Sequence, residues 1–237
     1  MKIEELETTD VKINKTEQNI DELLEIREPF LNKCGTTLIS GRCGSGKSTL
    51  LYSIFSGKGK ARVYRNVFDE IHFITPAAVM NSECAHPFKT HCPDRLYHHL
   101  NAEVLAKVVE DATRVKDAGG NSCLCIDDMS EFYKDKSIEQ LLKTLIYKHR
   151  HLRLNIVLTS LNLKSVPKNL RNLIDLYVIF KPSNIEIESF NDDVFQLSRD
   201  NLKQLVTYTF SKPYDFLAYN QKSNTFYKNM TKLKLEE

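Results

Sequence analysis

Short apolar runs alternate along this chain with longer segments whose apolar residues recur at helical spacing. The runs are four to six residues long and apolar or β-branched in character, which is typical of buried strands. They are Thr37–Ser40, Glu70–Thr75, Ser122–Ile126, Asn155–Ser160 and Leu176–Phe180. The alternation predicts an α/β protein with a mostly parallel central sheet covered by helices on both faces.

The helical segments between these runs carry start and stop signals. One helix is predicted over Ser48–Phe55, directly after a glycine-rich loop. A second is predicted from Asn101, a favourable N-cap residue, to a stop at Gly119-Gly120-Asn121. A third is predicted from Ser137, which would form a capping box with Gln140 three residues later.

Three regions of different character divide the chain. Residues 1–33 hold five Lys/Arg and nine Asp/Glu, which predicts an acidic arm, with one short helix over Asp21–Arg27. Residues 34–181 contain all five strand-like apolar runs, so we expect them to form the α/β core. Residues 182–237 break the alternation. Strand-like segments at 215–219 and 225–227 flank a turn at 220–224, which predicts a C-terminal hairpin in an extension packed on the core.

Composition excludes several protein classes. With 237 residues, 41% hydrophobic and 27% charged, the chain is an ordinary globular one. No apolar run has the length of a membrane span, and residues 1–7 do not resemble a secretion signal. Six scattered cysteines favour a reducing, intracellular setting. Outside the acidic arm the net charge is +6, which is compatible with a nucleic-acid partner without requiring one.

A complete phosphate-binding loop follows the first predicted strand. Residues 41–48 match G-x-x-x-x-G-K-[ST], and the strand before them and the helix after them supply the context that this motif needs. Glycines let the backbone N–H groups and the helix N-terminus approach a phosphate. Lys47 would reach the β- and γ-phosphates, and the Ser48 hydroxyl would bind Mg²⁺. The predicted nucleotide-binding residues are Gly41, Arg42, Cys43, Gly44, Ser45, Gly46, Lys47, Ser48 and Thr49.

Two adjacent acids end the third predicted strand. Ligands of an open parallel sheet bind at the carboxyl ends of its strands, where Asp127 and Asp128 stand. An acidic turn after a strand is often purely structural, but downstream of a phosphate loop Asp127 suits a Mg²⁺ shell. Asp128 suits the polarisation of an attacking water. An acid after the metal-binding one favours nucleotide hydrolysis over simple phosphate transfer to a substrate.

Other catalytic candidates are weaker. Thr159 and Ser160 end the fourth predicted strand, where a polar residue can sense the γ-phosphate, although a polar strand end is equally ordinary; Asn162 is a further candidate. For an arginine finger acting across a subunit interface, Arg171 is the first candidate, ahead of Arg150 and Arg153.

In combination, these segments resemble the viral genome-packaging ATPases of the FtsK–HerA superfamily, in the poxvirus-type branch also found in giant viruses and virophages. The resemblance covers about residues 29–230. In that family the fourth strand often ends in a Ser/Thr followed by glutamine, where this chain has Leu161. The segments that carry the resemblance are 29–48, Ile126–Met129, Tyr147–His151 with Asn155–Ser160, Val166–Asn172, Tyr214–Leu217 and Phe226–Asn229.

The resemblance implies a P-loop NTPase fold with an additional strand, as in RecA and FtsK–HerA proteins. It also implies ATP and Mg²⁺ as cofactors and hydrolysis coupled to movement of double-stranded DNA into a preformed capsid. The implied partners are DNA, further copies in a homo-oligomeric ring of five or six, and capsid vertex proteins, with no membrane. Arg171 would act on a neighbour's nucleotide. The implied location is the host-cell assembly site or the virion.

Two other functions remain open from the residues alone. One is a small-molecule P-loop phosphotransferase, against which the Asp127-Asp128 pair counts, and the other is a non-catalytic, NTP-gated assembly or DNA-binding protein, which the missing glutamine keeps open. Cys84, His86, His91 and Cys92 are metal-ligand types close together, but their spacing is not a standard zinc pattern. A polar loop is the preferred interpretation there.

Overall fold

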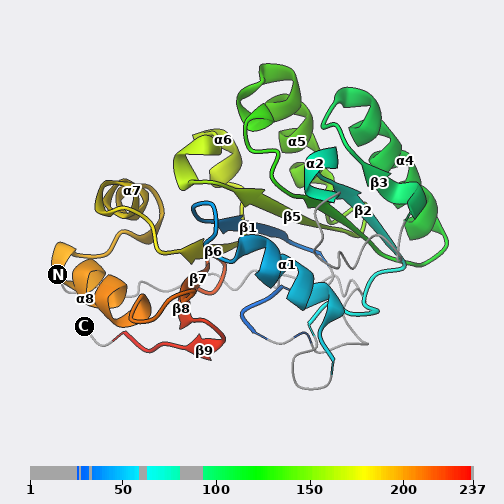
Figure 1. Cartoon of the computed structure of the whole chain (residues 1–237). Helices are drawn as coiled ribbons and strands as arrows, with labels where there is room; N and C mark the ends of the chain where they lie inside the picture. Colours follow the sequence, from blue (N-terminus) through cyan, green and yellow to red (C-terminus); the bar gives the residue numbers. More distant parts are fainter. Residues whose placement is uncertain (1–25, 27, 32–33, 59–62, 81–92, 236–237) are drawn as a thin grey trace, which may run out of the picture.

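A single mixed sheet organises the part of the chain that the computed structural model describes, which is residues 26, 28–31, 34–58, 63–80 and 93–235. Within those residues the sheet has nine strands in the order β3-β2-β4-β5-β1-β6-β7-β8-β9 (Figure 1). The strands are β1 (Thr36–Ser40), β2 (Glu70–Ile74), β3 (Leu96–Tyr97), β4 (Ser122–Ile126), β5 (Leu154–Ser160), β6 (Leu176–Phe180), β7 (Phe216–Asn220), β8 (Thr225–Lys228) and β9 (Thr231–Lys232).

The strands from β3 to β6 are parallel, as the sequence predicts. β5 lies between β4 and β1, pairing Leu158 with Ile126 on one side and with Leu38 on the other. A strand is therefore inserted between the phosphate-loop strand and the strand that ends in the two acids. This order confirms the predicted additional-strand P-loop architecture. It also places the carboxyl ends of β1, β4 and β5 next to one another.

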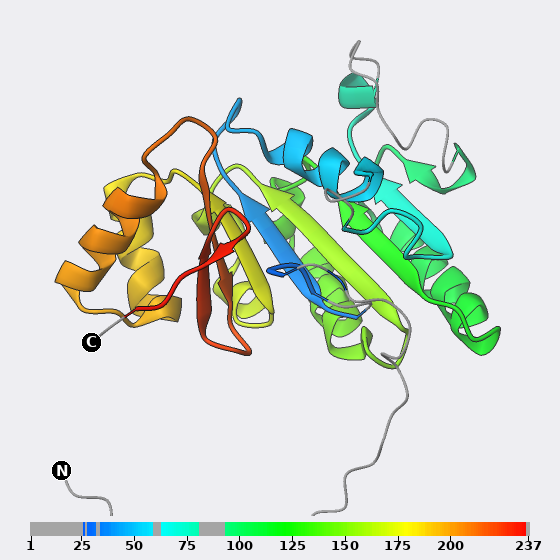
Figure 2. The same cartoon turned by 90° about the horizontal axis from the view of Figure 1, so that it is seen from below.

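Helices cover both faces of the sheet, also as predicted (Figures 1 and 2). α1 lies on one face, and α4 to α7 lie on the other. The α-helices are α1 (Lys47–Ser56), α2 (Ala77–Met80), α4 (Ala102–Asp117), α5 (Lys136–Lys148), α6 (Lys168–Arg171), α7 (Asn184–Phe190) and α8 (Arg199–Thr209). Shorter turns are the 3-10 helices η2 (Pro93–Arg95), η3 (Phe132–Lys134) and η4 (Leu163–Ser165), and the π-helix η5 (Asn191–Phe195).

Side chains of the central strands alternate between two apolar cores. In β5, Ile156 and Leu158 join the core beneath α4 to α8, while Val157 joins the core around α1. β4 alternates in the same way, with Leu124 in the first core and Cys123 in the second. Because both faces are buried, these strands read as continuous apolar runs rather than as alternating ones.

The predicted C-terminal hairpin is present and is part of the central sheet. β7 pairs antiparallel with β6, matching Phe216 to Phe180, and β8 pairs with β7 across the turn that follows Asn220. The sequence did not predict α7 and α8, because their compositions are polar. Each begins at a capping serine, Ser183 and Ser198, whose side chain accepts a hydrogen bond from a backbone N–H of the first turn. The domain boundaries at 33 and 181 remain predictions.

One predicted helix start is wrong. Asp135, not Ser137, caps α5: its carboxylate accepts hydrogen bonds from the N–H groups of Ser137 at 2.8 Å and Ile138 at 3.2 Å. A carboxylate caps as well as a hydroxyl and also complements the helix dipole. The other cap is confirmed, since the Asn101 side chain accepts from the Val104 N–H at 2.9 Å.

Two predictions fall outside the described residues. These are the short helix over Asp21–Arg27 and the metal-ligand types Cys84, His86, His91 and Cys92. Among the helices that are described, none is both long enough and apolar enough to cross a membrane.

Candidate nucleotide-binding and hydrolysis site

The phosphate loop connects the end of β1 to the start of α1, as predicted. Gly44 and Gly46 have φ values of 73° and 102°, which disfavour residues with a side chain. Gly41 has no room for one: a Cβ there would lie 2.6 Å from the Ser45 Oγ and 2.7 Å from the Phe180 Cβ. Two of these glycines are therefore required by backbone conformation and one by packing.

Lys47 lies inside the loop, with only 8% of its surface exposed. Its Nζ donates a hydrogen bond to the Arg42 carbonyl at 3.1 Å. Burial lowers the pKa of Lys47, and the charges of Asp128 and Asp127 oppose that shift. A triphosphate in the loop would offer the ammonium group a stronger acceptor than a neutral carbonyl.

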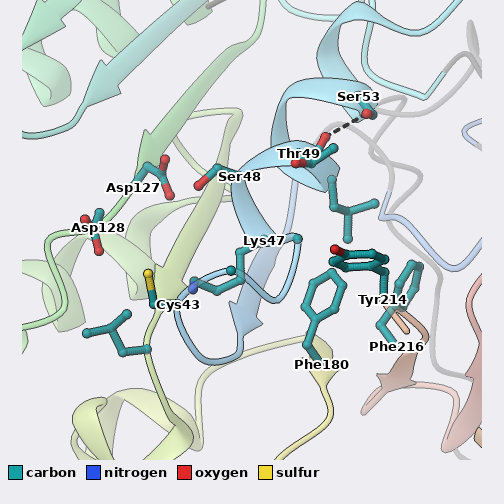
Figure 3. A pocket seen from close by; sticks show the side chains of 14 residues that line it. Cys43, Lys47, Ser48, Thr49, Ser53, Asp127, Asp128, Phe180, Tyr214 and Phe216 are labelled. Carbon is teal, nitrogen blue, oxygen red and sulfur yellow. Dashed lines mark hydrogen bonds between the residues drawn. The ribbon is translucent and has the colours of Figure 1, made fainter. Parts of the chain in front are cut away.

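Asp127 is the buried member of the acid pair. It is 1% exposed, and its Oδ1 accepts a hydrogen bond from the Thr159 hydroxyl at 2.8 Å. Burial raises the pKa of Asp127, against the lowering effect of the Thr159 bond. Its side chain faces Ser48 across the pocket (Figure 3). A carboxylate and a hydroxyl, both hard oxygen ligands, fit Mg²⁺, and the cation would offset the cost of burying the charge of Asp127.

Asp128 is the exposed member of the pair and lines the same pocket. Its φ is 55°, in the left-handed region. Its backbone N–H donates to the Thr159 hydroxyl at 2.9 Å. The Thr159 hydroxyl therefore joins the two acids, donating to the Asp127 carboxylate and accepting from the Asp128 backbone. The bond to the Asp128 N–H ties the left-handed backbone at Asp128 to the end of β5.

The other catalytic candidates lie outside the pocket lining. Thr159 and Ser160 are buried, and the Ser160 hydroxyl has no hydrogen-bond partner within the described structure. Leu161, in contrast, lines the pocket. Arg171 is on α6 and donates to Asp193 at 3.2 Å and to the Leu163 carbonyl at 3.5 Å. The sensor and finger roles of these residues remain predictions.

Arg150 and Arg153 lie just before β5, at the edge of the sheet opposite the phosphate loop. Arg150 is exposed, and Arg153 donates to the Gly119 carbonyl at 2.8 Å. Since the site lies at the carboxyl ends of the strands, neither arginine is near the nucleotide pocket of its own chain.

The pocket has a volume of about 640 Å³, within the range of small-molecule sites. Asp127, Asp128 and Ser48 lie at one end, Lys47 lies in the middle, and a group of aromatic rings lies at the other end (Figure 3). Sequence reasoning missed the aromatic end. The lining residues that it did not assign are Leu50, Ser53, Leu161, Phe180, Tyr214 and Phe216.

The family comparison is decisive. The family model of the poxvirus A32 protein matches residues 26–209. These residues include the phosphate loop, the acid pair and β5, which lies between β1 and β4 in the sheet. The chain belongs to the poxvirus A32 protein family. This confirms the resemblance inferred from the sequence. No curated protein matches the chain.

Solved structures share the fold of this A32 family member. The genome packaging NTPase B204 from Sulfolobus turreted icosahedral virus 2, in complex with ATP-gammaS, superposes with a TM-score of 0.60 at 19% identity, covering 86% of this chain and 100% of that one. B204, the DNA-packaging ATPase from Sulfolobus turreted icosahedral virus, gives 0.63 at 18% identity, covering 86% and 99%. The cytoplasmic domain of the type VII secretion ATPase EccC from Thermomonospora curvata gives 0.53 at 12% identity, covering 86% and 24%.

Thr159 provides a test of the site in this A32 family member. Thr159→Val keeps the β-branched shape but leaves the Asp127 carboxylate without this donor and the Asp128 N–H without its acceptor. We expect a loss of about 1–3 kcal/mol in the free energy of unfolding and a lower kcat. Urea denaturation and an ATP hydrolysis assay measure the two effects. Thr159→Ser, which keeps the hydroxyl, is the control, and a Val variant as stable as wild type would contradict the bridging role.

Proposed function

We propose that this chain is a Mg²⁺-dependent ATPase that drives double-stranded DNA into a viral capsid. The observation that carries the proposal is the convergence of Lys47, Ser48, Asp127 and Asp128 on one pocket at the carboxyl edge of an additional-strand P-loop sheet. Family membership supports it. So do the names of the B204 structures, which describe a genome packaging NTPase with bound ATP-gammaS.

In the proposed mechanism, the loop N–H groups and Lys47 hold the β- and γ-phosphates. Asp127 and Ser48 hold Mg²⁺, which neutralises charge on the phosphates when bound. Asp128 orients a water for in-line attack on the γ-phosphorus and accepts its proton. The Lys47 ammonium moves from the Arg42 carbonyl to the phosphate oxygens, where it stabilises the charge on the transferring group.

A motor that packages DNA must bind every sequence alike, so contacts to DNA phosphates are expected to dominate. We propose that it works as a homo-oligomeric ring on a capsid vertex, in which Arg171 of one copy reaches the nucleotide of the next. For that, Arg171 would have to exchange its bond to Asp193 for the γ-phosphate. In the described chain the pair is 3.2 Å apart.

The deciding experiment measures ATP hydrolysis by the purified chain with and without linear double-stranded DNA, across a salt series. We expect Mg²⁺-dependent turnover that DNA stimulates, with the stimulation falling steeply between 50 and ~200 mM salt because phosphate contacts release counterions. Chelation with EDTA should remove turnover, and restoring Mg²⁺ should recover it.

Other outcomes distinguish the alternatives. Turnover that is indifferent to DNA, together with transfer of phosphate to a small acceptor, would indicate a phosphotransferase. Nucleotide binding without turnover would indicate an NTP-gated assembly protein. Two linear DNA duplexes of equal length and unrelated sequence should stimulate ATP hydrolysis equally. A strong preference for one sequence would contradict the proposed DNA-packaging motor.

A further inference from the structure

Aromatic side chains that the phosphate chemistry does not use line the end of the pocket away from the two acids. Phe180, Tyr214 and Phe216 gather there (Figure 3). Phe180 and Phe216 are 3% and 7% exposed and pack on each other with ring centres 5.6 Å apart. Tyr214 is 71% exposed. The rings of Phe180 and Phe216 therefore form the buried wall at this end, and the Tyr214 ring presents its surface to the pocket.

These rings lie close to the phosphate loop itself. A Cβ placed on Gly46 would lie 3.4 Å from the Phe180 ring and 3.5 Å from the Tyr214 ring. The loop glycine thus sits at van der Waals distance from both. A nucleotide whose phosphates bind the loop N–H groups and Lys47 would extend its α-phosphate, ribose and base away from the acids, toward this end of the pocket.

The turn that carries Tyr214 is held in place before any ligand arrives. Tyr214 has φ 65°, a left-handed conformation that is costly for an aromatic residue. The Asp215 carboxylate accepts hydrogen bonds from the Lys212 N–H and the Asn229 side-chain amide, both at 2.9 Å. Asn229 in turn accepts from the Phe216 N–H at 2.9 Å. These bonds fix an unfavourable backbone conformation whose result is an exposed ring at the pocket.

We propose that Tyr214 is the platform on which the nucleobase stacks, with Phe180 and Phe216 supporting it. The proposal rests on the proposed function, in that the phosphate loop must hold a nucleotide. Every base can stack on an aromatic ring, and modest preferences between bases come from stacking strength, not from hydrogen bonds to the base edge. Asp215 is then a positioning residue, which acts through the turn.

The lining also predicts which bases are accepted. The charged side chains among the described lining residues are Asp127 and Asp128, at the end away from the rings, and Lys47, in the middle of the pocket (Figure 3). At the base end the lining offers the hydroxyls of Thr49 and Ser53, and the Ser53 hydroxyl already donates to the Thr49 carbonyl at 2.6 Å. Among the residues that the structure describes, no lining side chain at the base end carries an amide or a charge, and side chains of that kind discriminate weakly between base edges. We therefore expect ATP and GTP to bind similarly and CTP, with its smaller ring, more weakly.

Calorimetric titration of the full chain tests the platform, using ATP, GTP, CTP and inorganic tripolyphosphate. Tyr214→Ala should raise the Kd for ATP about five- to fiftyfold, the size expected for one lost base–aromatic stack. The same variant should leave the Kd for tripolyphosphate unchanged, because that ligand has no base. Tyr214→Phe, which keeps the ring, should bind ATP as wild type does.

A fluorescence measurement gives an independent readout. The chain contains no tryptophan, so Tyr214→Trp introduces a single indole at the pocket. ATP should quench its emission and tripolyphosphate should not. Tyr208→Trp is the matched control, since Tyr208 is 62% exposed on α8 and does not line the pocket. Quenching by ATP should be absent there.

The outcomes separate the two proposals. If tripolyphosphate binds in a Lys47-dependent way but Tyr214→Ala binds ATP as tightly as wild type, the platform is overturned and the phosphate site stands. If neither ATP nor tripolyphosphate binds, the proposed function fails. A preference for ATP over GTP of a hundredfold or more would overturn the weak base selectivity.

Discussion

Asp128→Asn is expected to leave ATP binding close to wild type and to lower kcat by about 10²–10⁴-fold, the usual contribution of a general base. The amide keeps the size of the carboxylate but cannot accept the proton of the attacking water. Binding persists because Lys47, Ser48 and Asp127, which hold the phosphates and Mg²⁺ in the proposed mechanism, are unchanged.

Asparagine is the right replacement at this position for a second reason. Asp128 has φ 55°, and asparagine is among the residues that tolerate the left-handed region. The backbone bond to Thr159 at 2.9 Å is therefore retained. A loss of turnover in this variant reports chemistry and not misfolding. Single-turnover hydrolysis and calorimetric binding measure the two quantities.

An exposed aspartate outside the pocket provides the control for the loss of one negative charge in Asp128→Asn. Asp200 is exposed in the first turn of α8, so Asp200→Asn removes the same charge far from the phosphate loop and should hydrolyse ATP at the wild-type rate. If Asp128→Asn also turns over at that rate, Asp128 is not the base, and the water must be activated by another group.

Lys47→Ala is expected to weaken ATP binding by about 10²–10⁴-fold, because two charge-assisted contacts to the β- and γ-phosphates contribute about 1.5–3 kcal/mol each. Turnover should become undetectable, since the same ammonium stabilises the transferring phosphoryl group. Lys203→Ala, which removes an exposed lysine from α8, should leave basal hydrolysis unchanged.

The stability of the nucleotide-free Lys47→Ala variant should not fall along with its activity. Burial lowers the pKa of Lys47 in the folded chain, so below that pKa its charged form is less favourable in the fold than in the unfolded chain. Removing the ammonium at neutral pH therefore relieves an unfavourable buried charge, which offsets the packing lost with the buried side chain, so the thermal midpoint of the nucleotide-free protein should stay close to that of the wild type. ATP with Mg²⁺ should raise the midpoint of the wild type and not of the variant. A nucleotide-free variant that unfolds at a markedly lower temperature would contradict this account.

The sequence alone predicted what depends on neighbouring residues and on the general rules of parallel sheets. The phosphate loop is contiguous, and its glycines, lysine and hydroxyl act through the backbone between one strand and one helix. The strands were recognised because burial on both faces makes them continuous apolar runs. The acid pair was assigned because the carboxyl ends of parallel strands meet at one edge, where Asp127 now lies opposite Ser48 (Figure 3).

Choices between adjacent residues needed the tertiary structure. Thr159 and Ser160 are equivalent in sequence. The pairing of Ile126 with Leu158 places Thr159 beside Asp127, and side chains alternate along a strand, so Ser160 points elsewhere. At the start of α5 the sequence predicted only Ser137 as the cap, and the structure shows Asp135 instead, because its carboxylate is the group that reaches the backbone N–H groups of Ser137 and Ile138.

Contacts between distant parts of the chain were beyond sequence reasoning altogether. Phe216 belongs to the predicted C-terminal hairpin and Tyr214 directly precedes it, and the sequence did not link either residue to the phosphate loop. They reach the phosphate loop because β7 pairs antiparallel with β6, which places Phe216 opposite Phe180 and turns the preceding loop toward Gly46. The phosphate end of the site was thus determined by local sequence. The aromatic end was decided by the pairing of β6 with β7, which brings together Phe180 and Phe216, 36 residues apart in the sequence. No local pattern specifies that pairing.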